Sequence, residues 1–373
     1  MNVQMPKLDL PLNDKAECSF TLPSEYYLSQ EIFEQEKNAI FYKTWQYIAH
    51  ESMLPNVGDY ITLKICDENI FVMRAPNNEL KAFYNICRHR AHELLEGQGN
   101  VKDAIICPYH AWSYNLDGSL NGARMSQHRP EFKKADFGLK EVRLEKICGF
   151  LFVNLDENAE SLSTIAKGLE EDIYKHVPYV DDLKLAGTDV FGETFTKAGW
   201  KVVVDNFVEC YHCLHAHPDF SSIIKMNKYE VDVNDYWSRQ LGPEIRHENS
   251  AYNVDPEKGA QGSVFWYLWP NTTFNVMPGA DEMAVFAVRP DEVETSFFGG
   301  HTFTKDGVLN QARADYVADI LVPEDIGLCE SVQRGLKSKS YDQGPFIVDD
   351  KRSGTGEHAL HHFHRLVQQA LEI

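Results

Sequence analysis

Hydrophobic and polar positions follow two different patterns along the chain, and each indicates a type of secondary structure. In residues 24–50, Phe33, Ile40 and Trp45 lie near helical spacing, which predicts an amphipathic helix. From Asp59 to about residue 155 the pattern changes to short runs rich in β-branched and aromatic residues, such as YITLKI, NIFVMRA and ELKAFYNI. Turn-forming pairs such as Asp117-Gly118 divide these runs, so the sequence predicts an antiparallel meander.

Beyond residue 155 the chain contains both the helical and the β-rich pattern. Helices are predicted at 160–176, at 323–337 and at 357–372, and Pro323 suits the first turn of the second one. Strands are predicted at 188–203, 263–277 and 283–288. The sequence therefore predicts an α+β protein in which a small all-β module is inserted near the N-terminus of a larger α+β domain.

The net charge of the chain makes nucleic acids and anionic membranes poor candidates as partners. The chain has 373 residues and a formal net charge of −20, and a surface with this charge repels phosphate backbones and anionic lipid. The first residues lack the basic and apolar regions of a signal peptide, and the apolar stretch 147–155 is too short to span a bilayer. We therefore expect a cytoplasmic protein, in which the 8 cysteines are thiols or metal ligands rather than a disulfide framework.

Two short motifs in the β-rich region combine cysteine with histidine. Cys87 and His89 are separated by one residue, and Cys107 and His110 by two. In a Rieske [2Fe–2S] centre two cysteines hold one iron and two histidines hold the other, so each loop must supply one ligand of each type. The order C-x-H then C-P-Y-H meets this need, whereas zinc fingers usually pair cysteine with cysteine. A structural zinc site is the alternative interpretation.

A second group of ligands follows in the segment WKVVVDNFVECYHCLHAHP. A helix through Val203 and Phe207 would place Glu209 beside His212, and Pro218 indicates that His217 lies beyond the helix end. Two histidines and one carboxylate make the facial triad that binds non-haem Fe(II). Downstream, Asp325 is the first candidate for that carboxylate and Glu324 the second. Either could instead serve the helix dipole.

The remaining cysteine and histidine patterns are given no metal. Cys210 and Cys213 form a C-x-x-C, but within a predicted helix we interpret them as small packing residues. The four histidines of the C-terminal tail are interpreted as a solvated helix face; they are His358, His361, His362 and His364.

Taken together, the motifs C-x-H…C-P-x-H and D-N-x-x-E-x-Y-H-x-x-x-x-H-P resemble the α subunits of Rieske non-haem iron oxygenases. Within that family, DNFVECYHCLHAHP, PEDIGLCESVQRGLKS and RSGTGEHAL are most similar to the group that oxidises quaternary ammonium compounds, such as carnitine, glycine betaine and proline betaine (stachydrine). The loop C-R-H-R-A, with Arg88 and Ala91, departs from the commoner C-P-H-R-G.

The resemblance implies a fold, a set of domains and two cofactors. An N-terminal helical segment, 1–44, would pack on the catalytic domain, followed by a Rieske domain, 45–155, and a helix-grip catalytic domain with the mononuclear iron, 156–373. The cofactors would be a Rieske-type [2Fe–2S] cluster and a mononuclear Fe(II). The assembly would be a homotrimer with the cluster of one subunit near the iron of the next.

The resemblance also assigns roles. Cys87, His89, Cys107 and His110 would hold the cluster. The mononuclear iron would be held by His212, His217 and Asp325. Glu209 would bridge the two centres between subunits, with Asp205 as the alternative.

The expected activity is that of a monooxygenase. Electrons from NAD(P)H would come from a separate flavin and iron–sulfur reductase, because the chain lacks a convincing dinucleotide-binding glycine motif. Hydroxylation of a C–H bond next to nitrogen would then cause N-demethylation or C–N cleavage. Aromatic faces attract quaternary ammonium groups, so the candidate substrate-binding residues are Phe207, Tyr211, Trp266, Trp269 and Phe274. The alternatives are an aromatic-ring-hydroxylating dioxygenase and an electron-transfer Rieske protein without oxygenase activity.

Overall fold

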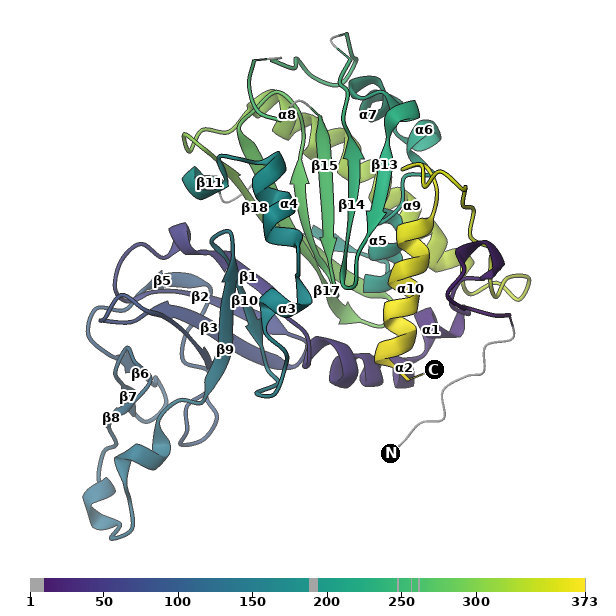
Figure 1. Cartoon of the computed structure of the whole chain (residues 1–373). Coiled ribbons are helices and arrows are strands. Elements are labelled where there is room, and N and C mark those ends of the chain that lie inside the picture. Colours follow the sequence, from purple (N-terminus) through teal and green to yellow (C-terminus); the bar gives the residue numbers. More distant parts are fainter. Residues whose placement is uncertain (1–9, 188–193, 247, 256, 261, 373) are drawn as a thin grey trace. The chain divides into compact units, whose positions relative to one another are not determined.

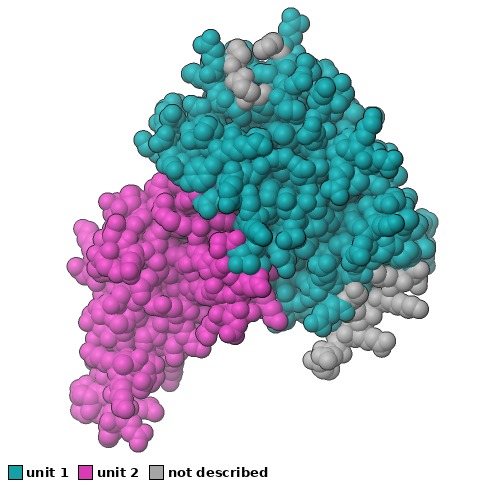
Figure 2. Space-filling view, viewed as in Figure 1, with its two compact units in different colours: residues 1–40, 164–373 teal, residues 41–163 magenta. Residues whose placement is uncertain are grey.

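The structure is a computed structural model that describes residues 10–187, 194–246, 248–255, 257–260 and 262–372. The chain divides into two compact units (Figure 2). The first comprises Met1–Ile40 with Thr164–Ile373, and the second Phe41–Ser163. Among the described residues, no helix has the length and apolar character needed to cross a membrane.

The second unit is built on antiparallel sheets (Figure 1). Seven strands form the larger sheet in the order β1-β10-β9-β4-β3-β2-β5. Their bounds are β1 Gln46–His50, β2 Asp59–Ile65, β3 Glu68–Arg74, β4 Leu80–Tyr84, β5 Gln98–Asn100, β9 Glu141–Ile147 and β10 Phe150–Asn154. The predicted meander is confirmed, and the near-continuous burial of β3 shows why the run NIFVMRA is so apolar.

A smaller sheet of three strands comprises β6 Ile105–Ile106, β7 Ser113–Tyr114 and β8 Leu120–Gly122. The predicted turn at Asp117-Gly118 joins its last two strands. Gly118 has a φ of +85°, and a Cβ atom there would meet the ring of Phe83 at 2.3 Å. Glycine is therefore required at this turn by both backbone conformation and space.

The first unit contains an antiparallel sheet of eight strands, ordered β11-β18-β17-β16-β15-β14-β13, with β12 also paired to β18. The bounds are β11 Lys184–Gly187, β12 Thr194–Thr196, β13 Glu230–Val233, β14 Trp237–Gly242, β15 Ser263–Leu268, β16 Thr272–Val276, β17 Glu282–Glu292 and β18 Thr295–Thr304. Because side chains alternate between faces, Phe265 and Trp266 on β15 point to opposite sides of this sheet.

Helices cover both faces of the sheet (Figure 1). Their bounds are α1 Glu25–Leu28, α2 Gln30–Glu36, α3 Leu162–Ile165, α4 Leu169–His176, α5 Trp200–Phe207, α6 Cys213–Ala216, α7 Pro218–Ile223, α8 Gln311–Tyr316, α9 Val322–Gly335 and α10 His358–Ala370. The α4 side is reached by Trp266, whose Nε1 donates to Asp172 at 2.8 Å. The opposite side carries α5, α8 and α9, and it is here that the candidate site lies.

Two of the predicted elements are wrong in part. The predicted helix 24–50 ends with a π-helical turn at Lys37–Phe41, and β1 follows, because the run QYIAH is buried at every position in a sheet. The predicted strand 188–203 is a strand only at β12, while Trp200 begins helix α5; residues 188–193 lie outside the described residues. The β-branched run Val202–Val204 favours a strand by propensity, but burial of one helix face overrides it. The helices predicted at 323–337 and 357–372 are confirmed by α9 and α10.

The interpretation of the C-terminal histidines as a solvated face is wrong. Helix α10 buries His361 and His364, which are 8% and 0% exposed. His364 accepts the backbone N–H of Leu22 at Nδ1 over 3.0 Å, so its Nε2 carries the proton. The apolar positions of α10 are so interleaved with histidine that the sequence alone hides its buried face.

Candidate metal centres

The segment after α5 changes direction at each functional residue. Helix α5 ends at Phe207, so the helix predicted through Val203 and Phe207 does not extend to His212, and a short helix α6 begins at Cys213. His217 then separates α6 from α7 with a φ of −122°, and Pro218 opens α7. Proline disfavours the α conformation for the residue before it, which is why His217 leaves the helical path.

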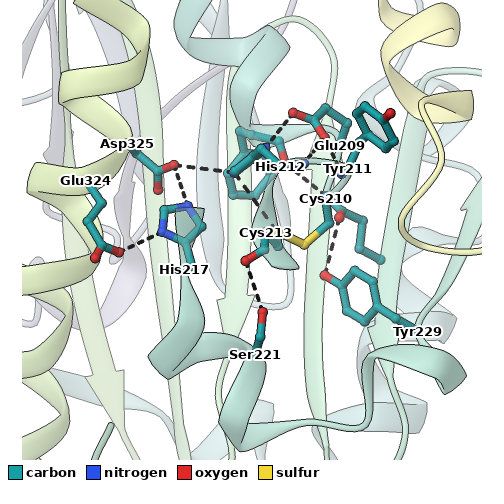
Figure 3. The surroundings of a disulfide bond; sticks show 12 residues. Glu209, Cys210, Tyr211, His212, Cys213, His217, Ser221, Tyr229, Glu324 and Asp325 are labelled. Carbon is teal, nitrogen blue, oxygen red and sulfur yellow. Dashed lines mark hydrogen bonds and ion pairs between the residues drawn. A yellow bond between two sulfur atoms is a disulfide. The ribbon is translucent and has the colours of Figure 1, made fainter. Parts of the chain in front are cut away.

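Helix α9 supplies the carboxylate that faces these histidines (Figure 3). Ligand atoms of His212, His217 and Asp325 all lie within 4.8 Å of one another. Asp325 Oδ1 lies 2.9 Å from His217 Nε2 and 3.5 Å from His212 Nε2. Two imidazoles and one carboxylate converging in this way suit a divalent iron with open positions. The residues therefore fit the mononuclear metal that the sequence predicts.

A second carboxylate stands behind each histidine (Figure 3). Glu209 Oε1 lies 2.5 Å from Nδ1 of His212, and Glu324 Oε2 lies 2.8 Å from Nδ1 of His217. A carboxylate at Nδ1 keeps the proton there and leaves Nε2 free as a ligand. The sequence leaves Glu324 as an alternative ligand. In the structure Glu324 lies on the Nδ1 side of the His217 ring, away from Asp325. Spacing could not distinguish these roles, because Glu324 and Asp325 are adjacent.

The charges within this group are mutually stabilised. Burial lowers the pKa of His212, but Asp325 and Glu209 outweigh that effect and raise it to about 9. Burial raises the pKa of Asp325, yet its hydrogen bonds to the two histidines bring it down to about 2. The carboxylates thus favour positive charge at the histidines, and a metal cation that binds there must displace protons.

Asp205 is held by a different set of partners. Its Oδ2 accepts from the Tyr27 hydroxyl at 2.7 Å, and its Oδ1 from His364 Nε2 at 3.0 Å. Both oxygens are therefore engaged by the N-terminal segment and α10, away from the histidine pair.

Cys210 and Cys213 are joined by a disulfide, so their interpretation as packing residues alone is wrong. Their Cα atoms are 4.9 Å apart, and both side chains are buried on either side of His212 in the chain (Figure 3). The turn between α5 and α6, where the sequence predicts a helix, brings them together.

An apolar cavity adjoins the histidine pair. Two hollows, of about 130 Å³ and about 100 Å³, share Phe207, Phe265, Leu321 and Asp325 in their walls. Phe286 and Phe298 complete an aromatic wall, with ring centroids 6.2 Å apart. The alternation of side chains along the strands places these lining residues on one face of the sheet. Phe265, Asn275 and Ala284 are cross-strand neighbours, and Phe286 lies two residues beyond Ala284 on the same face.

Of the predicted substrate-binding residues, the structure places Phe207 in this wall and the other four elsewhere. Tyr211 is 54% exposed. Trp266 and its cross-strand neighbour Phe274 occupy the opposite face of the sheet. Trp269 packs against Phe363 with centroids 6.0 Å apart. Phe286 and Phe298 were missed, because an aromatic run in a strand does not reveal which face meets the site.

The four residues of the first motif are held by two loops of the same design. Ala91 donates its backbone N–H to Cys87 O at 2.9 Å, and Ala111 donates to Cys107 O at 3.0 Å. Both alanines have positive φ, 53° and 56°. Ala91 is the residue where the family more often has glycine, so this departure places a Cβ in a left-handed turn.

The loops gather cysteine and histidine separately. Cys87 and Cys107 are both 2% exposed, while the rings of His89 and His110 lie 4.7 Å apart. Nδ1 of His110 is buried and has no hydrogen-bond partner among the described residues. A buried nitrogen without a partner is costly unless it binds a metal. Trp112 stacks on His89 with ring centroids 4.9 Å apart. These residues fit a Rieske cluster.

Comparisons with known proteins agree on both halves of the chain. Residues 44–133 match the family described as the Rieske [2Fe-2S] domain. Residues 172–373 match the family described as the ring hydroxylating alpha subunit (catalytic domain).

Similar proteins span almost the whole chain. The carnitine monooxygenase oxygenase subunit of Acinetobacter baumannii is 40% identical over 357 residues, covering 95% of both chains. The glycine betaine monooxygenase oxygenase subunit of Pseudomonas aeruginosa is 27% identical, covering 88% of this chain and 85% of its own. Among solved structures, a quaternary ammonium Rieske monooxygenase in complex with L-carnitine matches with a TM-score of 0.85 and 39% identity, covering 95% of this chain and 96% of its own.

Proposed function

Because the chain belongs to the ring-hydroxylating α-subunit family and is a Rieske oxygenase with a [2Fe–2S] cluster and a mononuclear iron, we propose that it is a monooxygenase component acting on quaternary ammonium compounds. The observation that carries this proposal is the aromatic cavity that opens on Asp325. Aromatic faces attract a cation that cannot donate hydrogen bonds, and carboxylates nearby add a negative field.

We assign the metal ligands as the sequence suggests. His212, His217 and Asp325 would hold the iron, and Cys87, His89, Cys107 and His110 would hold the cluster. When bound, the cluster supplies single electrons and the iron activates dioxygen for hydroxylation of a C–H bond next to nitrogen.

The chain's own residues prepare the site in two ways. Glu209 and Glu324 hold protons at Nδ1 of the two histidines, so that both Nε2 atoms point toward Asp325. The rings of Phe207 and Phe286, with centroids 5.7 Å apart, enclose space beside that carboxylate and exclude water from it.

Glu209 is our candidate for the residue that links two subunits. Its Oε1 contacts His212, and the side chain is 12% exposed, so it retains a path to the surface. Asp205 is the weaker alternative, since Tyr27 and His364 engage both of its oxygens.

The larger organisation is also proposed. The domains would be 1–44, 45–155 and 156–373; contacts of Tyr27 with Asp205 and of Leu22 with His364 support packing of the first segment on the third. The antiparallel sheet with α9 and α10 is consistent with a helix-grip catalytic domain. A homotrimer and a separate flavin and iron–sulfur reductase complete the proposal; the cytoplasmic location stays a prediction.

Oxygen uptake tests the activity. The purified chain, with a surrogate reductase and NADH, would be offered carnitine, glycine betaine, choline and an aromatic acid, and the aldehyde and amine products would be measured. We expect coupled uptake with a quaternary ammonium compound. Coupled turnover of the aromatic acid alone, with a diol as product, would instead support a ring dioxygenase.

A further inference from the structure

A buried cation lines the otherwise apolar cavity beside Asp325. Arg313 on α8 contributes to its wall, with a side chain that is only 5% exposed. The other polar lining residues are Asn275 and Asp325. A guanidinium in such surroundings is rare unless it is paired, because burying a charge is costly.

One carboxylate only partly satisfies this guanidinium. Arg313 forms an ion pair with the fully buried Glu282, while its Nε has no hydrogen-bond partner among the described residues. A guanidinium carries five N–H donors, and a single carboxylate accepts from two of them in the fork geometry. Burial lowers the pKa of Arg313 to about 10, so the group remains charged at neutral pH. The Nε–H donor is therefore left for a further anion.

The cavity is elongated along one helical run. Helix α8, the π-helical turn Val317–Leu321 and α9 follow one another without a break from Gln311 to Gly335. Ala314, Val317, Leu321 and Val322 line the cavity between Arg313 and Asp325. Arg313 and Asp325 are twelve residues apart along this run, so the two charged residues enter the cavity from different turns at opposite ends of the wall.

The charges at the two ends are opposite in sign. Asp325, with Glu209 and Glu324 behind the histidines, makes one end acidic. Arg313 makes the other end a donor of charge-assisted hydrogen bonds. Such a cavity is complementary to a long zwitterion with its cation toward the histidines.

We propose that Arg313 binds the carboxylate of a zwitterionic quaternary ammonium substrate and so selects it over choline-like cations. The inference rests on the proposed function and deepens it. A ligand that reaches from the acidic end to Arg313 needs several carbon atoms between its charges. Trimethylammonium butyrate (γ-butyrobetaine) and carnitine have three carbon atoms between their charges, whereas glycine betaine has one and reaches less far from the acidic end.

Binding measured by calorimetry under argon tests the inference without turnover. The ligands are γ-butyrobetaine, its methyl ester, glycine betaine and choline. The variant is Arg313→Gln combined with Glu282→Gln, because Gln at 313 alone would leave Glu282 buried and unpaired. Arg334→Gln, an exposed position of α9, is the matched control.

We expect the unmodified chain to bind γ-butyrobetaine about 10- to 100-fold more tightly than the ester, the range of a charge-assisted hydrogen bond. In the double variant the affinity for γ-butyrobetaine should fall to that of the methyl ester, and the affinity for the ester should not change. Equal affinities for acid and ester in the unmodified chain, or an equal loss of both in the double variant, would overturn the role of Arg313 while the oxygenase assignment stood. If neither ligand bound and only the aromatic acid supported turnover, the proposed function itself would fail.

Discussion

At the scale of single residues, Glu324 shows that the sequence does not reveal the role of a side chain in contact with a candidate metal ligand. It lies beside Asp325 in the chain, yet the two carboxylates meet opposite nitrogens of His217. The direction of each side chain on α9 decides which is ligand and which is orienter. Residue spacing contains no such information.

Replacing Glu324 by Gln should therefore weaken metal binding without unfolding the protein. Glutamine cannot hold the Nδ1 proton of His217 as a charged acceptor does, so we expect Fe(II) and Co(II) affinity to fall about 10- to 100-fold. Titration of the metal-free chain with Co(II), followed by its absorption spectrum, measures this loss.

Glu330→Gln is the matched control on the same helix. Glu330 accepts the backbone N–H of Lys197, and glutamine keeps an acceptor oxygen for it. An equal loss of affinity in both variants would show that charge on α9, and not the contact with His217, matters.

The candidate metal ligands can be predicted from the sequence for a chemical reason. Metals constrain residue type and spacing together, as in Cys87 with His89 and in His212 with His217, and the structure brings each set together. The cavity residues obey no such rule, because any apolar side chain on the right face serves.

At the scale of elements, the eight-stranded sheet shows how strand parity sorts the aromatic residues. Phe265 and Phe274 lie on adjacent strands, but the cross-strand partner of Phe265 is Asn275, and that of Phe274 is Trp266. One face therefore lines the cavity while the other packs beneath α4. A shift of register by one residue would exchange these roles.

Alanine at the two phenylalanine positions should consequently have different effects. Phe265→Ala should raise the Kd for a quaternary ammonium ligand about three- to thirty-fold through loss of a cation–π contact. Phe274 is 0% exposed, so Phe274→Ala should lower the free energy of unfolding by about 3–5 kcal/mol. Calorimetry and urea unfolding of both variants separate the two effects. Similar affinities in both would argue against the aromatic wall.

Helix α10 gives the protein a dependence on pH. Burial lowers the pKa of His362 from its ordinary value of 6.5 to about 4, and it also lowers the pKa of His361. Between pH 6.5 and about 4, His362 takes up a proton in the unfolded chain but not in the folded chain. The contribution of His362 to stability is thus full above pH 6.5 and declines as the pH falls toward 4.

His362→Gln should flatten that decline by about 1 to 3 kcal/mol. Glutamine cannot be protonated, and its amide nitrogen can still reach the carbonyl of Asp235, the partner of His362 Nε2 at 3.2 Å. Urea unfolding at pH 7.5, 6, 5 and 4.5 provides the curve. If the variant and the unmodified chain lost stability in parallel, other groups would be responsible.

At the scale of the whole molecule, the division into two compact units follows from the sequence more securely than the limits of each element do. Residues 41–163 consist largely of short strands joined by turns, while the later chain alternates sheet with helices. The inserted β module can be predicted because that succession of short β-rich runs extends over many residues. By contrast, the end of the first helix at Phe41 depends on tertiary burial, which the local pattern does not contain.

Subunit mixing tests whether the proposed trimer joins one subunit's cluster to its neighbour's iron. Cys107→Ser removes a cluster ligand, and Asp325→Ala removes an iron ligand, so each variant alone should be inactive. After both are dissociated and reassembled in equal amounts, each interface draws an intact cluster with probability one half and an intact iron site with probability one half. Activity should therefore return to roughly a quarter of that of the unmodified chain treated alike, since closed trimers present three equivalent interfaces. Mixed trimers that stayed inactive, while iron and sulfide analysis showed the expected cofactors, would place the two cooperating centres within a single chain and exclude the bridging role of Glu209 between subunits.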